Sequence, residues 1–203
     1  MTIKRGESWG RQVPRPDQLR FIDTDAALAA ALAEMSERPV AVGGGDLART
    51  IGVSPDVGRD QFNELPIDLI EVRLDGGAVR LVCAHVAVRS PWWRGSWWFG
   101  PLLLVMNAEF LGRWKVTERG HPNDGRVEVL RCDKTMSFRQ RVAARRRLPT
   151  GGHLPHPAIE SRSMSQSEWS YASPQVVVLD GRKVGRFSKV NVVVRPDAAT
   201  IYG

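Results

Sequence analysis

The sequence predicts an α+β protein in which a small α/β part at the N-terminus precedes a larger, antiparallel, β-sandwich-like domain. Up to Gly52 the pattern is strand, helix, strand, glycine turn and helix, which is typical of an open α/β layer. After Pro66 apolar and polar residues alternate with a period of two, which indicates strands. The chain has 203 residues, of which 42% are hydrophobic and 25% charged. That composition supports a buried core and excludes wholesale disorder.

The α/β part is predicted over residues 20–66, as a partial nucleotide-domain-like segment. An irregular lead-in over residues 1–19 precedes it, because Pro, Gly and Arg gather there. The elements expected in order are a strand (21–22), a helix (26–37) with N-cap candidates at 23–25, a strand (39–42), a glycine turn (43–46) and a short helix (47–51) that ends at Gly52.

The β-rich part is predicted over residues 67–203. Its alternating segments are separated by Asp-Gly and Gly-rich turns, a spacing typical of a β-sandwich or a bent sheet. One helix with Ser137 as its N-cap interrupts the strands. The strands expected are 67–74, 78–88, 102–108, 126–132, 175–179 and 189–194, and the helix is 137–147.

The charge balance favours an anionic partner. Lys and Arg number 29 against 22 Asp and Glu, a formal net charge of +7. A nucleic acid is not expected, because the surface aromatics of an RNA-binding sheet are not evident. Cys83 and Cys132 are interpreted as free thiols in a reducing compartment. No apolar run reaches the roughly eighteen residues of a membrane-spanning helix, so we expect a cytoplasmic protein, with a peripheral membrane location left open.

The glycine turn and the residues after it are the most informative stretch. Three glycines between a strand and a helix permit positive φ and bring backbone N–H groups close to a ligand, and a helix N-terminus favours a negative group. The same pattern is also typical of a purely structural βα turn. The predicted ligand- or phosphate-binding residues are Gly43, Gly44, Gly45, Asp46 and Arg49.

This stretch resembles the P-x-G-T-G-N-D-x-A-R-x-L-G segment of diacylglycerol kinases and related bacterial lipid kinases. The matching positions are Gly43, Gly45, Asp46, Ala48, Arg49 and Gly52. Further blocks follow in the family's order at residues 66–69, 105–107, 121–129, 151–153, 176–181 and 192–198. The resemblance covers about residues 20–198 and implies the lipid-kinase or NAD-kinase-like fold. For an active enzyme it implies ATP and Mg²⁺ as cofactors, Asp68 and Asp124 as catalytic carboxylates, and Asp124 also as a metal ligand.

Two departures from the family argue against catalysis. Residues 23–27, Asp-Thr-Asp-Ala-Ala, stand where the family has the G-G-D-G-T loop that holds the ATP phosphates, so two carboxylates replace glycines. Arg182 stands where the family has the Glu of D-G-E, its general base, and a guanidinium cannot accept a proton. Asp68 and Asp124 also have structural interpretations, as a strand-end carboxylate and the start of a hairpin turn.

Two surface features suggest contact with a membrane or a partner. Trp92, Trp93, Trp97 and Trp98 form a cluster that fits a lipid or protein interface, because indole favours the boundary between water and acyl chains; the alternative is a turn with buried rings. The predicted helix carries Arg145, Arg146 and Arg147, a face for an anionic membrane or phosphate, or a solvated helix end.

Three functions remain open from the sequence. The first is a diacylglycerol-kinase-like protein that is catalytically impaired and binds a lipid or a phosphorylated ligand. The second is an active ATP-dependent lipid kinase that uses Asp68 or Asp124. The third is a non-enzymatic interaction module, whose Trp cluster mediates a homodimer or binds a partner chain.

Overall fold

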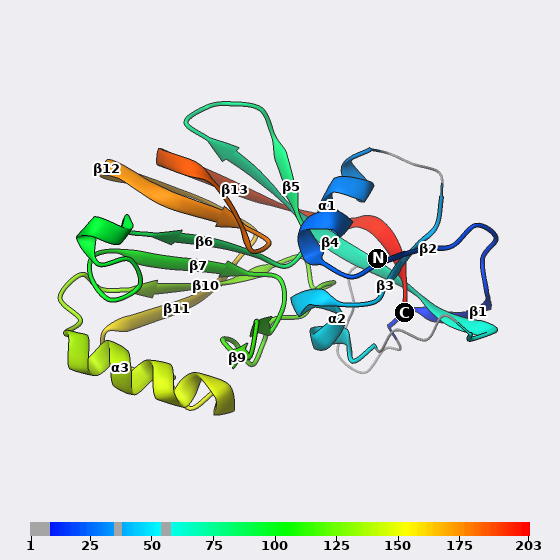
Figure 1. The fold of residues 1–203 in the computed structure, drawn as a ribbon, viewed down its shortest axis with the longest axis horizontal. Coiled ribbons are helices and arrows are strands. Elements are labelled where there is room, and N and C mark those ends of the chain that lie inside the picture. The colour runs from blue at the N-terminus through cyan, green and yellow to red at the C-terminus, as the bar shows by residue number, and fades with distance from the viewer. Residues whose placement is uncertain (1–8, 35–37, 54–57) are drawn as a thin grey trace.

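The computed structural model describes residues 9–34, 38–53 and 58–203, and Figure 1 shows their arrangement. The elements in chain order are β1 (Arg11–Pro14), β2 (Arg20–Ile22), α1 (Asp25–Ala33), β3 (Val40–Val42), α2 (Gly45–Ile51), β4 (Gln61–Leu74), β5 (Arg80–Val82), β6 (His85–Arg89), η1 (Trp92–Arg94), β7 (Leu102–Met106), β8 (Phe110–Leu111), β9 (Trp114–Lys115), β10 (Val127–Cys132), α3 (Phe138–Arg147), η2 (Leu148–Thr150), β11 (Ile159–Met164), β12 (Gln166–Leu179) and β13 (Arg182–Tyr202).

The predicted α/β elements are confirmed, and their ends have local causes. Thr24 caps α1, since its side chain accepts a hydrogen bond from the Ala27 N–H at 3.3 Å. Gly52 ends α2 with a φ of 73°, a left-handed conformation that suits glycine. β2 and β3 pair in parallel. The last residues of the first predicted helix, 35–37, lie outside the described part of the chain.

The irregular lead-in expected over residues 1–19 contains a strand. β1 pairs antiparallel with β4, with Val13 opposite Phe62. Residues 1–8 of the predicted lead-in lie outside the described residues. Pro14 and the exposed polar residues of β1 hide the strand from a pattern search, because a short edge strand needs no apolar alternation.

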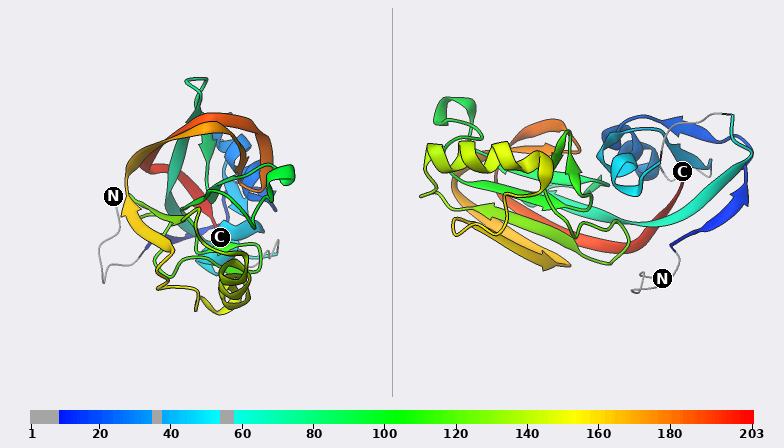
Figure 2. Two further views of the ribbon diagram at one scale, coloured as in Figure 1. Left: turned by 90° about the vertical axis from the view of Figure 1, so that its left-hand side faces the viewer. Right: turned by 90° about the horizontal axis from the view of Figure 1, so that it is seen from below.

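One sheet joins the two predicted parts. Among the described residues, eleven strands form a single sheet along the path β1-β4-β13-β12-β6-β7-β10-β11, with β2, β3 and β5 attached. The sheet curls strongly, so that it arches around its own interior when seen end-on (Figure 2, left). The boundary predicted between residues 66 and 67 falls inside β4, which runs on without a break. β13 also pairs with β3. The α/β part is therefore joined to the β-rich part both through β4 and through this pairing.

Two hydrophobic cores meet along β4. Ile67 and Leu69 belong to the core beneath α1 and α2, whereas Ile70 and Val72 belong to the core enclosed by the curled sheet. The inward-facing residues thus change from odd to even numbers at Leu69–Ile70. Directly opposite, β13 has an irregular register between Arg195 and Ala199. β4 and β13 therefore bend together where the two cores join.

The strands predicted over 102–108 and 126–132 and the helix over 137–147 are present as β7, β10 and α3. The single strand predicted over 78–88 is wrong: the chain bends at Cys83 and Ala84, whose N–H groups bond the Asp180 carboxylate, so that β5 pairs with β4 and β6 pairs with β7 and β12. α3 begins at Ser137 with a complete capping box, in which Ser137 and Gln140 bond each other's backbone N–H groups. β12 and β13 extend well beyond the predicted 175–179 and 189–194, and β11 was not predicted. These extra residues are mostly exposed or half-buried and polar, so their alternation is weak.

Candidate functional site

A carboxylate of the chain itself covers the glycine turn. Asp25, at the start of α1, is 6% exposed. Its Oδ2 accepts the Asp46 N–H at 2.7 Å and its Oδ1 accepts the Leu47 N–H at 3.1 Å. These two N–H groups are the donors that the start of α2 would offer to a phosphate. A Cβ added at Gly45 would collide with this carboxylate, so the glycine is required for the close approach.

Asp46 and Arg49 hold a neighbouring loop. Asp46 Oδ1 accepts the Gly112 N–H at 2.7 Å, and the Arg49 guanidinium donates to the Gly112 carbonyl at 2.7 Å. The same guanidinium lies 4.2 Å from the centre of the Phe110 ring. The binding role predicted for these two residues is not tested by this geometry, but both are committed to contacts within the chain.

Asp180 fixes the backbone behind the turn. It accepts three backbone N–H groups, those of Cys83, Ala84 and His85, each at 2.9 Å. His85 is 2% exposed, and its Nδ1 lies 3.4 Å from Asp46 Oδ2, too far for a strong hydrogen bond. Burial raises the pKa of Asp180 to about 6 and lowers the pKa of His85 to about 4. The thiol of Cys83 is fully buried here, and burial raises its pKa.

Burial, and secondly the charge of Asp25, raise the pKa of Asp46 to about 6. Asp46 is therefore still mostly ionised at neutral pH, and the neutrality of His85 follows from burial, which lowers the pKa of His85 to about 4. We conclude that His85 is neutral in the folded protein, although a carboxylate lies close by. Asp25, Asp46, His85 and Asp180 thus form a largely buried polar cluster. The three carboxylates accept backbone N–H groups, whereas neither ring nitrogen of His85 has a hydrogen-bond partner among the described residues.

Asp68 lies at the bend where the two cores meet. It is completely buried, and both carboxylate oxygens accept backbone N–H groups, from Asp197 at 2.9 Å and from Gly125 at 2.6 Å. Burial raises the pKa of Asp68. Asn107 links Asp68 to the polar cluster, because its amide donates to the carbonyls of Asp68 and Cys83. Asp68 therefore joins three segments of backbone, whatever else it does.

Asp124 lies next to this junction in a half-buried turn. Its Oδ1 accepts the Arg126 N–H at 2.9 Å, and burial, followed by the charges of Asp68 and Glu128, raises its pKa to about 6. Within the described ranges no group of three or more His, Cys, Asp or Glu side chains is arranged to hold a metal ion. ATP and Mg²⁺, the cofactors that the resemblance implies for an active kinase, remain a prediction.

Arg182 is exposed at the start of β13. The preceding turn, with Asp180 at a φ of 45°, directs Asp180 inward and leaves Arg182 in solvent. Residue 182 therefore presents a guanidinium where the family has the Glu that serves as general base.

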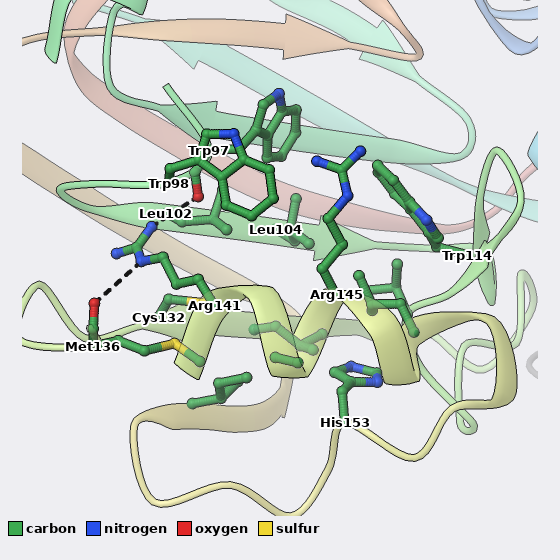
Figure 3. A pocket seen from close by; sticks show the side chains of 15 residues that line it. Trp97, Trp98, Leu102, Leu104, Trp114, Cys132, Met136, Arg141, Arg145 and His153 are labelled. Atoms are coloured by element: carbon green, nitrogen blue, oxygen red, sulfur yellow. Dashed lines mark hydrogen bonds between the residues drawn. The ribbon is translucent and has the colours of Figure 1, made fainter. Parts of the chain in front are cut away.

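An apolar cavity of about 90 Å³ lies between α3 and the sheet (Figure 3). Arg145 rises from α3 between two indole rings, 4.9 Å from the centre of Trp98 and 4.8 Å from that of Trp114. The size exceeds what one water molecule requires, and the lining is almost entirely apolar. The lining residues are Trp97, Trp98, Leu102, Leu104, Trp114, Val116, Leu130, Cys132, Met136, Arg141, Ala144, Arg145, Leu148, His153 and Ile159.

The Trp cluster divides into two pairs. Trp92 and Trp93 are 79% and 54% exposed, whereas Trp97 and Trp98 are half-buried at the cavity. Of the arginines, Arg145 lies at the cavity, and Arg146 and Arg147 are exposed. Whether any of them contacts a membrane or a partner remains a prediction.

Several residues around these sites were not predicted from the sequence. Asp25 was predicted only as an N-cap candidate and as a departure from the family, and its contact with α2 joins residues 21 positions apart with no periodic signal. His85 lies in the strand predicted over 78–88 and was not singled out. Trp114 lies in β9, and His153 belongs to the block matched at 151–153, but neither was assigned a role in a site.

The fold is that of structures described as diacylglycerol kinases. A crystal structure of one such protein from Bacillus anthracis superposes with a TM-score of 0.65 at 11% identity, covering 91% of this chain and 77% of the other. Another from the same organism gives a TM-score of 0.63 at 11% identity, with 91% and 75% covered. No family model matches the sequence, and no curated protein gives a significant match. The chain therefore has a diacylglycerol-kinase-like fold, and at this identity the likeness defines the fold alone.

Proposed function

We propose that this protein is a lipid-binding relative of the diacylglycerol kinases that does not transfer phosphate. The observation that carries the proposal is the contact of Asp25 with α2. A carboxylate already accepts the two N–H groups that would face a phosphate, and its charge would repel a triphosphate. Phosphoryl transfer depends on positioning and charge neutralisation, and both are opposed here.

The acceptor side of the reaction is also compromised. A lipid hydroxyl must lose its proton to a base, and Arg182 cannot take it. Asp68 is completely buried and both of its oxygens accept backbone N–H groups, which keeps its carboxylate away from a substrate hydroxyl.

The cavity beneath α3 supports the lipid part of the proposal. Leu102, Leu104 and Leu130 form an apolar floor on the sheet, and the helix supplies Ala144 on the opposite side. An acyl chain gains by leaving water for such a space. Arg145 lies at the cavity beside the indole rings, where a positive charge suits an anionic headgroup.

Filling the cavity tests this proposal. The probe is a dansyl-labelled undecanoic acid, whose fluorescence rises in an apolar site. Ala144→Leu places a larger side chain in the cavity and should weaken probe binding by about tenfold or more. Ala143→Leu is the matched control, because Ala143 is exposed on the same helix and does not line the cavity.

Equal probe affinity in both variants would refute lipid binding in this cavity. The same titration with inorganic phosphate separates a lipid from a phosphorylated ligand. We expect no competition between phosphate and the probe. Phosphate binding without probe binding would instead favour the phosphorylated ligand.

A further inference from the structure

Four exposed aromatic side chains come from the η1 loop and from the first residue of α3, two segments that lie at the same end of the molecule (Figure 1). We call these four side chains the aromatic tip. Trp92, Trp93, Phe99 and Phe138 are 79%, 54%, 53% and 48% exposed. Large apolar side chains gathered in this way in water mark an interaction site.

Contacts below the aromatic tip join the η1 loop to α3. Phe99 and Phe138 stack with ring centres 5.8 Å apart, which joins the η1 loop to α3. Arg141, only 5% exposed, donates to the carbonyls of Trp97 and Gly100 and so fastens the loop from below. A Cβ added at Gly95 would collide with the Phe99 ring, so this glycine permits the packing. The exposed rings are therefore presented by a braced loop.

The surroundings of the tip are basic. Three stretches of sequence contain no Asp or Glu, namely 76–108 with η1, 134–159 with α3 and 181–196 in β13, although the exposed Asp133 lies just before α3. Arg186 of β13 lies 5.1 Å from the centre of the Trp93 ring, and Arg94 donates to Ser173. Exposed arginines also extend along α3, at positions 139, 146 and 147.

We propose that the aromatic tip docks on the surface of an anionic lipid bilayer. Indole rings favour the interfacial region, and arginines bind the phosphates of anionic lipids. A second copy of the chain is a poorer occupant, because two basic rims would face each other across the contact.

The tip adjoins the apolar cavity. Trp98 lines the cavity and also lies 5.4 Å from the Phe138 ring. Docking would therefore bring the indole and arginine side of the cavity to the level of the lipid headgroups. Docking itself requires no acyl chain in the cavity, so it goes beyond the proposed function and can fail independently of it.

Vesicle flotation tests the proposal with the full chain. Vesicles of phosphatidylcholine with phosphatidylglycerol should carry the protein upward, and vesicles of phosphatidylcholine alone should carry much less. Trp92→Ser with Trp93→Ser should lower partitioning on the order of tenfold. Arg139→Gln with Arg146→Gln should lower it by roughly thirtyfold. The control is Arg73→Gln with Arg80→Gln, which removes the same charge from exposed positions on β4 and β5.

The aromatic variant is Trp92→Ser with Trp93→Ser, and the tip charge variant is Arg139→Gln with Arg146→Gln. The proposal is overturned if both variants partition like wild type. It is also overturned if the Arg73 and Arg80 control loses as much binding as the tip charge variant, since net charge alone would then explain the attraction. A wild-type mass of a dimer that falls to a monomer on changing Trp92 and Trp93 would assign the tip to self-association instead. The two tip variants are independent and alter exposed side chains, so a folding defect in one leaves the other decisive.

Discussion

At the scale of single residues, the carboxylate of Asp25 accepts the backbone N–H groups at the glycine turn. Asp25 lies at the first position of α1 and reaches across to the first turn of α2. Its charge takes the place that an anionic ligand would occupy at a helix start. The contact of this carboxylate with the first turn of α2 makes the glycine turn a structural link between the two helices.

Loss of this carboxylate should destabilise the fold. Asp25→Ala leaves the N–H groups of Asp46 and Leu47 without their partner, and we expect the free energy of unfolding to fall by about 2 kcal/mol. Urea unfolding measures the change. Asp23→Ala, two residues earlier and exposed, is the control and should change stability by less than about 0.5 kcal/mol. Equal losses in the two variants would contradict the role given to Asp25.

The pH dependence of stability should reveal the buried His85. Its pKa is about 4 in the folded protein, below the ordinary 6.5, so it contributes stability above pH 6.5 that is lost as the pH falls toward 4. Asp46 acts in the opposite direction, because its pKa is raised to about 6; its contribution is full below about 3.8 and is lost as the pH rises through 6.

Unfolding measured between pH 7 and pH 4 separates these two groups. His85→Phe should flatten the loss of stability on acidification, by up to about 3 kcal/mol over the range. Asp46→Asn should make the same loss steeper. Parallel curves for wild type and both variants would show that neither group titrates as described.

At the scale of elements, Asp68 joins β4, the turn before β10 and the irregular part of β13. The three segments meet where β4 passes from one core to the other, and each needs a partner for a buried backbone group. A motif search assigns this residue to catalysis, whereas its contacts are those of a structural junction.

The substitution Asp68→Asn should therefore lower stability in the absence of any ligand. The amide NH₂ must face one of the two N–H donors, from Gly125 or Asp197, and we expect a loss of about 2 kcal/mol. Asp124→Asn is the comparison, because Asp124 accepts the backbone N–H of Arg126 in a half-buried turn, and the variant should lose less than about 1 kcal/mol. Thermal unfolding followed by circular dichroism measures both. If Asp68→Asn does not lower stability, Asp68 would again be a candidate catalytic residue.

At the scale of the whole molecule, local pattern predicted the elements better than their assembly. Ser137 and the alternation of 126–132 identified α3 and β10 because caps and strand periodicity are local signals. A bent sheet was one of the predicted arrangements, but a single sheet that joins both parts was not predicted, since the pairing of β13 with β4 and β3 depends on contacts far apart in sequence. The same holds for the sites: Asp68 and Asp124 were found by motif, whereas the contact of Asp25 with α2 and the cavity beneath α3 arise only on folding.

The most direct test of the account is incubation of the purified protein with γ-labelled ATP, Mg²⁺ and vesicles that contain diacylglycerol. We expect no labelled phosphatidic acid above a sample without protein, because the site of the phosphates is filled by Asp25 and no base replaces Arg182. Labelled phosphatidic acid that accumulates in proportion to time and protein, and is abolished by Asp124→Asn, would contradict the account.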